Sequence, residues 1–259
     1  MKKYLRDLTV VEKVMLNSRH VLLKLTQEAP LPDILPGQFV EVRVDCSPST
    51  FLRRPISVNF VDRNANQLWL LIQVIGEGTR HLSTLQVADK VNVLFPLGNG
   101  FTMAENKQNK VLLVGGGVGV APLLYFGAEL KRRGYEDVSF ILGAKTGDDL
   151  LMLDNFQLFG TVFTTTEDGS LGEKGFVTQH SVLNNVRFDN IYCCGPKPMM
   201  VSVAKYAKAH TISCEVSLEN MMACGLGACL CCVENTKEGN VCVCKEGPVF
   251  NINDLLWQI

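Results

Sequence analysis

The hydrophobic pattern of the chain changes near residue 104, and this change constrains the fold more than any other feature. From about residue 8 to residue 103, short apolar runs are separated by turn residues. In "QFVEVRV", for example, Val40, Val42 and Val44 alternate with Glu41 and Arg43, and "VNVLF" alternates in the same way. A period of two is typical of strands with one buried face. This part is therefore predicted to form an antiparallel barrel or sandwich.

The rest of the chain alternates between strand-like and helix-like segments. A polar stretch, "AENKQNK", has the composition of a linker. After it, apolar runs such as "KVLLVGGG", "VSFILGA" and "NIYCCG" alternate with helical patterns such as "PLLYFGAELKRRG" and "PKPMMVSVAKYAKAH". This alternation predicts a parallel sheet covered by helices. Beyond Leu218 the periodicity fades, which indicates a small subdomain stabilised by something other than a core. We predict three units, residues 1–103, 104–213 and 214–259.

Length and charge narrow the possible functions. At 259 residues the chain exceeds one comfortable core, so we expect two domains and a small appendage. The net charge of −1, with acids and bases interspersed, gives no reason to expect binding to nucleic acid or to an anionic membrane. No apolar stretch reaches the length of a membrane span, and a cytoplasmic protein is expected. In a reducing compartment, ten cysteines are ligands or buried thiols more readily than disulfides.

Six of the ten cysteines lie between residues 224 and 244. Three of them have the spacing C-x4-C-x2-C, and another cysteine follows after eleven residues. Plant-type ferredoxins bind a 2Fe-2S cluster with cysteines in this arrangement. The candidate ligands are therefore Cys224, Cys229, Cys232 and Cys244. Gly225 and Gly227 would let the backbone bend tightly and bring amide N–H groups near the sulfur atoms.

The other cysteines leave alternatives open. A structural zinc site is the main one, but such sites usually combine two C-x2-C-like knuckles, whereas the first gap here holds four residues. Cys231 and Cys242 lie in the same segment, and either could substitute for a neighbouring ligand. Three further cysteines lie in apolar, strand-like runs, where a buried thiol is the default interpretation: Cys46, Cys193 and Cys214.

A glycine run follows the first strand of the second unit and precedes a helix. Glycines at such a turn let the main chain approach a phosphate closely, and the helix N-terminus supplies N–H donors. The candidate nucleotide-binding residues are Gly115, Gly116, Gly117 and Gly119. The run departs from G-x-G-x-x-G at Val120. The sequence also lacks the acidic residue that would be expected about twenty positions later to bind the ribose. It therefore does not distinguish binding of NAD from binding of NADP.

Two later loops are predicted to reach the same edge of the sheet. The segment "TTEDGSLGEKGFV" follows a strand, and residues 167–169 either meet a ribose or an adenine or form a solvated surface turn. The segment "CCGPKPMM" ends another strand and opens a helix, which would place Cys194, Gly195 and Pro196 at this edge.

An arginine pair stands out in the β-rich unit. Arg53 and Arg54 precede Pro55 in the strand-like segment "FLRRPISV". A stiffly held arginine fork suits bidentate binding of a pyrophosphate, with Ser57 as a further donor. The alternative is an exposed pair on the solvent face of a strand.

The order of these motifs resembles the ferredoxin-reductase superfamily. R-P-I-S is followed by G-x-G-T, by G-G-G-x-G-x-A-P and by C-G-P-x-x-M, and the C-terminal "ACGLGAC" with "CKEGPVF" resembles the electron transfer subunits of type B dihydroorotate dehydrogenase. The resemblance implies an antiparallel β-barrel that binds FAD, a parallel-sheet domain that binds NAD, and a small C-terminal 2Fe-2S subdomain. It implies FAD contacts at Arg54, Pro55, Ile56, Ser57, Leu71, Ile72, Gln73, Gly78 and Thr79. It also assigns the nicotinamide nucleotide to Gly115, Gly116, Gly117, Gly119, Cys194, Gly195 and Pro196, and the cluster to the four candidate thiols.

The resemblance also implies a function. A partner subunit containing FMN would oxidise dihydroorotate in pyrimidine (UMP) biosynthesis, and this chain would pass the electrons through a 2Fe-2S cluster and FAD to NAD. A heterotetramer with two copies of each subunit is expected, and this chain would hold no dihydroorotate site. Two alternatives stay open. One is a reductase subunit of a hydrogenase, sulfide or ferredoxin-NADP system, and the other is a non-catalytic scaffold that binds a nucleotide and zinc.

Overall fold

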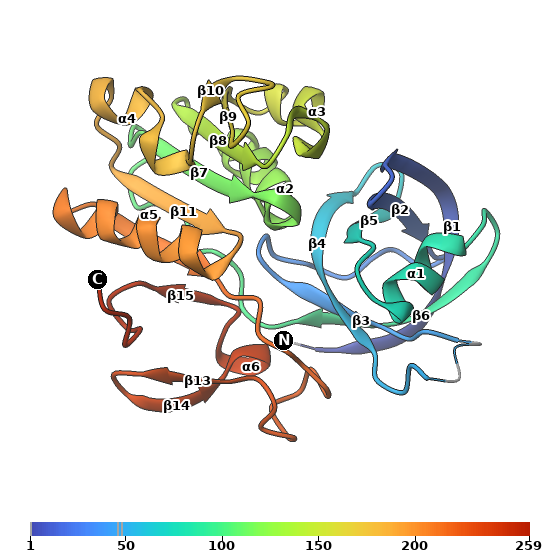
Figure 1. The fold of residues 1–259 in the computed structure, drawn as a ribbon. Coiled ribbons are helices and arrows are strands. Elements are labelled where there is room, and N and C mark those ends of the chain that lie inside the picture. Colours follow the sequence, from blue (N-terminus) through green and yellow to red (C-terminus); the bar gives the residue numbers. More distant parts are fainter. Residues whose placement is uncertain (1, 46, 48) are drawn as a thin grey trace.

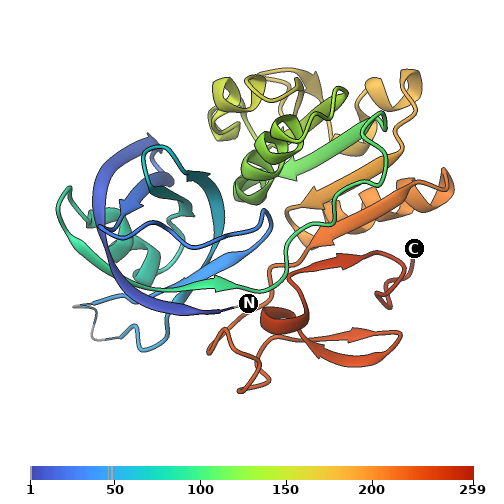
Figure 2. The ribbon, with the colours of Figure 1, turned by 180° about the vertical axis from the view of Figure 1, so that it is seen from behind.

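The computed structural model describes residues 2–45, 47 and 49–259, and Cys46 lies outside the described residues. Figure 1 shows a barrel beside a helix-covered sheet, with the C-terminal segment below the sheet and against the barrel. Figure 2 shows the same arrangement from behind. None of the helices formed by the described residues has the length and apolar content that crossing a membrane requires.

The N-terminal unit is a closed antiparallel barrel, as predicted. Its strand order is β1-β2-β5-β4-β3-β6. The strands are β1 (Tyr4–Asn17), β2 (His20–Thr26), β3 (Phe39–Val42), β4 (Arg54–Asp62), β5 (Gln67–Gln73) and β6 (Lys90–Leu97), and helix α1 (Glu77–Thr84) follows β5. The alternating side chains Val40, Val42, Val91 and Val93 are buried in one core inside the barrel. The period-two pattern therefore marked the inner face correctly.

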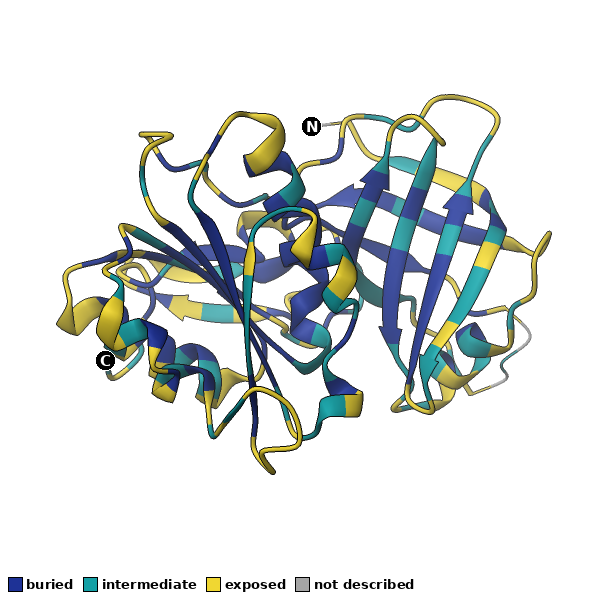
Figure 3. Ribbon diagram, turned by 90° about the horizontal axis from the view of Figure 1, so that it is seen from above, coloured by how far each residue is buried: buried dark blue, intermediate teal, exposed yellow. Residues whose placement is uncertain are grey.

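The second unit is a sheet with helices on both faces, again as predicted. Its elements are β7 (Val111–Gly116), η1 (Gly117–Val120), α2 (Ala121–Arg132), β8 (Val138–Ala144), η2 (Gly147–Asp149), α3 (Leu153–Gln157), β9 (Thr161–Thr166), β10 (Glu173–Lys174), η3 (Val177–Gln179), α4 (Val182–Asn185), β11 (Asn190–Cys194), α5 (Lys197–Ala209) and β12 (Ser213–Ser217). Along β7, Leu112 and Val114 pack in one core with α5, and Val111 and Leu113 pack in another with α2. Buried strands accordingly run through the middle of Figure 3.

The C-terminal segment is joined to this sheet. It comprises the hairpin β13 (Val233–Thr236) and β14 (Gly239–Cys242), the short helix α6 (Val243–Glu246) and β15 (Val249–Asn251). The sheet order is β10-β9-β8-β7-β11-β12-β15, in which β15 pairs antiparallel with β12 and the other neighbouring strands are parallel. Val243, Cys232 and Cys244 also belong to the core that contains Phe39 of the barrel. The prediction that something other than a core stabilises this segment is therefore incomplete, because apolar side chains of the segment share the core of the larger units.

Candidate cofactor sites

A cavity of about 760 Å³ opens at the carboxyl ends of the parallel strands, where the sheet faces the barrel. This edge of an open α/β sheet is the usual place for a ligand. Residues of both units line the cavity, among them Arg19, His20 and Gln73 of the barrel and Gly116, Gly117, Val118, Gly119, Lys145, Asp149, Glu167, Phe176, Thr178, Pro196, Met199 and Ser202 of the sheet unit.

The predicted glycine run forms the floor of this cavity. Gly116, Gly117 and Gly119 line it, and Gly117 has a positive φ of 56°. A Cβ atom at Gly119 would lie 2.5 Å from Cα of Gly195 and 2.7 Å from the carbonyl oxygen of Cys194. Glycine at 119 therefore lets the glycine run and the C-G-P loop touch. Gly115 is not among the residues that line the cavity. A Cβ there would meet Cγ1 of Val120 at 2.8 Å, so the glycine allows close packing.

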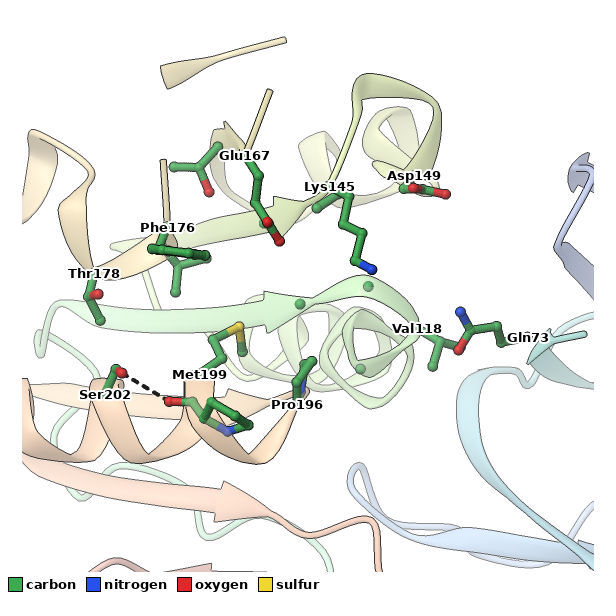
Figure 4. Close-up of a pocket in the computed structure, with 18 of the residues that line it drawn as sticks. Gln73, Val118, Lys145, Asp149, Glu167, Phe176, Thr178, Pro196, Met199 and Ser202 are labelled. Carbon is green, nitrogen blue, oxygen red and sulfur yellow. Dashed lines mark hydrogen bonds between the residues drawn. The ribbon is translucent and has the colours of Figure 1, made fainter. Parts of the chain in front are cut away.

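The C-G-P loop contributes to the cavity through its proline. Pro196 lines the cavity and, with Met199, borders it on the side of α5 (Figure 4). Cys194 is fully buried, and burial raises the pKa of its thiol well above the usual value. This thiol is therefore protonated at neutral pH. The predicted edge is correct for all three residues of the motif, but only Pro196 lines the cavity wall.

The two acidic residues of the turn after β9, Glu167 and Asp168, have different roles. Asp168 accepts hydrogen bonds from the amide of Ser170 at 2.9 Å and from its hydroxyl at 2.6 Å, and these bonds lower the pKa of Asp168. It therefore stabilises the turn itself. Glu167 lines the cavity on the same side as Lys145, and Figure 4 shows both side chains extending into it.

The sequence reasoning missed the barrel residues Arg19 and His20 at this cavity. Arg19 donates to both carboxylate oxygens of Asp149 at 2.7 Å, and Asn17 donates to the carbonyl of Asp148 at 2.7 Å. These bonds link the β1–β2 turn to η2 across the two units. No local signal marks such residues, because a turn between strands gives no hint of its distant neighbour. Lys145 was also missed, although its place after β8 follows the strand-end rule.

The predicted flavin residues lie on β4, β5 and α1. Residues 54–57 open β4 and are half-buried. A Cβ atom at Gly78 would lie 3.0 Å from Cδ of Arg54, so the glycine leaves room for the arginine beside α1. The hydroxyl of Thr79 accepts hydrogen bonds from the amides of Ile75 and Gly76 at 3.0 Å and so orders the start of this helix. An arginine beside a helix start suits a phosphate group.

The remaining candidate flavin-binding residues differ in whether their side chains or only their backbone can reach a cofactor. Leu71 and Ile72 are buried, so a cofactor would meet their backbone, whereas Gln73 extends from the barrel towards Val118 (Figure 4). Of the arginine pair, Arg53 donates to the carbonyls of Glu41 and Asn92 at 3.2 Å and to Oδ1 of Asn92 at 2.6 Å. Arg53 therefore ties neighbouring strands together, and Arg54 is the arginine beside α1.

The cysteine loop directs backbone amides at its thiols. Leu226 donates to Sγ of Cys224 at 3.4 Å, and Gly227 donates to Sγ of Cys244 at 3.1 Å. The amide of Cys244 donates to Sγ of Cys232 at 3.4 Å. Gly225 and Gly227 have φ values of 65° and 79°, as their predicted role requires. Although burial acts in the opposite direction, amide hydrogen bonds lower the pKa of Cys224 to about 6, which favours a thiolate.

The candidate thiols influence one another: Cys229 acts on Cys224, and both Cys232 and Cys224 act on Cys244. Four cysteine thiols, three of them spaced C-x4-C-x2-C and the fourth downstream, are the donor set that fits a 2Fe-2S cluster.

The other cysteines take different environments. Cys231 is exposed, whereas its neighbour Cys232 is buried beside Cys244, and this favours Cys232 as the third ligand. The half-buried Cys242 donates weakly to the carbonyl of Gly227 at 3.8 Å. Cys193 and Cys214 are buried as predicted, and burial raises the pKa of Cys214 to about 12.

Comparisons with known proteins agree with this geometry. Residues 219–256 match a family described as the iron-sulfur cluster binding domain of dihydroorotate dehydrogenase B, and residues 113–205 match the oxidoreductase NAD-binding domain. An electron transfer subunit of dihydroorotate dehydrogenase B (NAD(+)) from Fusobacterium nucleatum is 35% identical over 97% of this chain and 98% of its own length. Its counterpart from Caldanaerobacter subterraneus is 41% identical over 86% of this chain and 87% of its own length.

Solved structures share the fold. The structure of an NADH-dependent reduced ferredoxin-NADP oxidoreductase, described in connection with flavin-based electron bifurcation, covers 96% of this chain with 90% of its own, at 29% identity and a TM-score of 0.82. A flavohemoglobin from Malassezia yamatoensis with bound FAD and heme is 17% identical, covers 82% of this chain with 60% of its own, and has a TM-score of 0.69, which shows the fold alone. Because these curated relatives are 35% and 41% identical to it over most of its length, this chain belongs to the family of electron transfer subunits of dihydroorotate dehydrogenase B.

Proposed function

We propose that this chain carries electrons in pyrimidine biosynthesis, from the FMN of a dihydroorotate-oxidising partner, through a 2Fe-2S cluster and FAD, to NAD. The observation that carries the proposal is a segment with four candidate thiols, three of which accept hydrogen bonds from backbone amides. The same chain has a nucleotide cavity that is lined by both the sheet and the barrel. One chain thus contains the side chains for all three cofactors.

Each cofactor has its own set of residues. The thiols of Cys224, Cys229, Cys232 and Cys244 would hold the cluster. Arg54 with the start of α1 would hold FAD, together with the strand residues 55–57 and 71–73. A bound flavin exchanges a hydride with NAD and single electrons with an iron-sulfur centre. The protein fixes the positions of these groups, and the amides at the sulfur atoms favour the thiolate form that binds iron.

The cavity residues account for binding of NAD. The backbone amides of the glycine run would receive the pyrophosphate, because glycines there let the main chain approach a phosphate closely. Glu167 would accept a hydrogen bond from a ribose hydroxyl and repel an additional phosphate on the same sugar. Lys145 lines the same cavity, where its positive charge would offset part of the negative charge of the bound nucleotide.

The partner is a catalytic subunit, since the curated relatives are named as electron transfer subunits of a dehydrogenase. We propose that it contains FMN and that two copies of each subunit assemble. Apolar side chains around the cysteine loop are exposed, with Met221 at 85% and Leu230 at 66%. Exposed apolar groups beside a redox site suit a protein interface.

Reconstitution tests the proposal. The purified chain should contain iron and acid-labile sulfide in equal amounts together with FAD. Mixed with an FMN-containing catalytic partner, it should support dihydroorotate-dependent reduction of NAD. A colourless protein carrying zinc would contradict the cofactor assignment, and a coloured protein without orotate-coupled NADH formation would contradict the choice of partner.

The likeness to the NADH-dependent ferredoxin-NADP oxidoreductase supports one second candidate, a reductase subunit of a ferredoxin system. Reduced ferredoxin as electron donor separates the two. Under this alternative it would reduce the chain's FAD rapidly, and the dihydroorotate-oxidising partner would have no effect.

A further inference from the structure

Asn59 is a buried polar residue in the contact between the barrel and the sheet unit. It lies on β4, two residues after Ser57, and no part of it is exposed. Its Nδ2 donates to the carbonyl oxygen of Ala121 at 3.0 Å. Ala121 is the first residue of α2 and directly follows η1, which contains Gly117 and Gly119. A buried hydrogen bond therefore joins the proposed FAD-binding strand to the end of the glycine run.

A bulge in β4 lies at this residue. Val58 pairs with Leu70 of β5. Two residues later Phe60 pairs with Trp69, which is only one residue from Leu70. Asn59 is therefore the extra residue of β4. Bulges re-aim side chains and are common beside functional sites. Here the bulge lets the amide of Asn59 reach the neighbouring unit.

The other atom of the amide has no such bond. Among the described residues, Oδ1 of Asn59 has no hydrogen-bond partner, although it is buried. A buried polar atom without a partner destabilises a fold. A leucine of similar size would fill the same contact without this penalty. What distinguishes asparagine here is therefore the directional bond from its Nδ2 to α2.

A second buried hydrogen bond attaches the same helix to the barrel. Tyr125 lies one turn further along α2, packs in the barrel core, and donates from its hydroxyl to the carbonyl of Ile34 at 3.1 Å. Figure 1 shows α2 on the side of the sheet that faces the barrel. The pair of Arg19 with Asp149 is more exposed, and water screens it. The two buried bonds therefore fix the start of α2 against the barrel.

We propose that Asn59, supported by Tyr125, is a positioning residue that sets the glycine run relative to the FAD-binding strand for hydride transfer. This inference rests on the proposed function, in which β4 binds FAD and the glycine run binds NAD. The two reacting groups are then held by different units. A misplacement of about 1 Å between reacting groups can slow a reaction about 100-fold. Asn59 limits such misplacement where the two units meet.

The test compares Asn59→Leu and Tyr125→Phe with the unsubstituted full chain loaded with FAD. Each variant removes one bond between α2 and the barrel and nearly preserves side-chain size. Rapid mixing with NADH, which transfers a hydride to FAD and leaves as NAD, gives the limiting rate of flavin bleaching and the Kd for NADH. The limiting rate should fall about tenfold in Asn59→Leu and about threefold in Tyr125→Phe. The Kd for NADH should stay within about twofold, since neither side chain lines the cavity.

Amide hydrogen exchange provides a measurement that does not depend on turnover. Without added nucleotide, residues 117–125 should exchange several-fold faster in both variants, because the start of α2 has lost an attachment. The melting temperature should fall by no more than about 4 °C, because the apolar cores are unchanged.

The matched control is Thr26→Val, which removes a bond within one unit. The hydroxyl of Thr26 donates to the carbonyl of Asn66 at 2.7 Å. Thr26 ends β2, whereas His20, at the other end of that strand, lines the cavity. This variant should leave both the limiting rate and the exchange of residues 117–125 unchanged.

Several results would overturn the inference. One is an unchanged limiting rate in Asn59→Leu, or in Tyr125→Phe if the leucine variant does not fold. A weaker Kd for NADH at an unchanged limiting rate would instead make Asn59 a nucleotide-binding residue. An equal loss of rate in Thr26→Val would make the effect one of general stability. If NADH does not reduce the FAD of the unsubstituted chain, the proposed function fails, and hydrogen exchange still reports whether Asn59 fixes α2.

Discussion

The glycine run at the nucleotide cavity and the cysteine loop are both glycine-rich turns at the end of a strand. Different interactions fix the position of each turn. The glycine run after β7 lies on a fully buried strand, and backbone contacts with the C-G-P loop fix its position. The cysteine loop follows β12 and has exposed apolar residues before and between its thiols, such as Met221 and Leu230. Its hydrogen bonds run from amides to sulfur atoms that are themselves candidate ligands.

The difference teaches that the core alone shapes the nucleotide cavity, whereas the cysteine loop depends on its ligand set in addition to the core. Burial of apolar strands shapes the nucleotide cavity before any ligand arrives. In the cysteine loop, binding of iron by thiolates contributes free energy of folding locally. Substitutions should therefore act on the nucleotide cavity through sterics and on the cysteine loop through loss of the metal centre.

The largest effect is expected from Cys232→Ser. Loss of a buried thiol paired with Cys244 should abolish the visible absorbance and the reduced-state electron paramagnetic resonance signal of the cluster. The exposed neighbour serves as control, and Cys231→Ser should keep both signals. If Cys231→Ser removes the cluster and Cys232→Ser retains it, the ligand assignment is wrong.

Gly119→Ala should have the next largest effect, at the nucleotide cavity. Its Cβ would meet backbone atoms of the C-G-P loop at 2.5 to 2.7 Å, and backbone cannot rotate away as a side chain can. An overpacking cost of about 1–3 kcal/mol corresponds to a loss of about fivefold to 100-fold in NAD affinity.

Titration with NAD, monitored through the flavin absorbance, measures this loss. Gly134→Ala, in the loop after α2, is the control: a Cβ there meets nothing within 4 Å, so its positive φ of 85° should cost stability but not NAD affinity. Unchanged NAD affinity in Gly119→Ala would show that the two loops can separate, and the contrast with the cysteine loop would disappear.

Glu167→Gln should have a smaller effect, on cofactor selectivity. Removing the negative charge should lower the preference for NAD over NADP by about tenfold, because the repulsion of an added phosphate is lost. Steady-state kcat/KM with each nucleotide measures the preference. Asp168→Asn is the control, because Asp168 is engaged in its own turn with Ser170. Relaxed selectivity in Asp168→Asn alone would reverse the roles of the two acids.

Asp149→Ala should have the smallest effect, although its pair with Arg19 joins the two units. The arginine side chain is 54% exposed, so water screens the pair, and its loss should cost about 0.5–1 kcal/mol in the free energy of unfolding. Denaturant titration measures this. Asp33→Ala breaks an exposed pair with Arg63 within the barrel and should cost less. A loss of several kcal/mol in Asp149→Ala would show that the cavity depends on this contact more than on the core.

Much of the architecture could be predicted because it depends on local patterns. Alternation of Val40 and Val42 identified a barrel strand, and the apolar run before Gly115 identified β7. The spacing of the four thiols identified the cluster-binding segment, which matches the family domain at residues 219–256. Each of these signals lies within one short stretch of sequence, where the geometry of the backbone determines how neighbouring residues are placed.

The sequence by itself therefore determined the barrel, the parallel sheet and the chemistry of the cysteine segment. Only the tertiary structure decided that β15 joins the sheet, that Arg19 of the barrel reaches the nucleotide cavity, and that Arg54 rather than Arg53 lies beside α1. It also decided the burial of Glu41, which a period-two pattern places on the outer face of the barrel. The physical reason is that burial of an outward-facing residue depends on which distant segment packs over it, and no local periodicity records that partner.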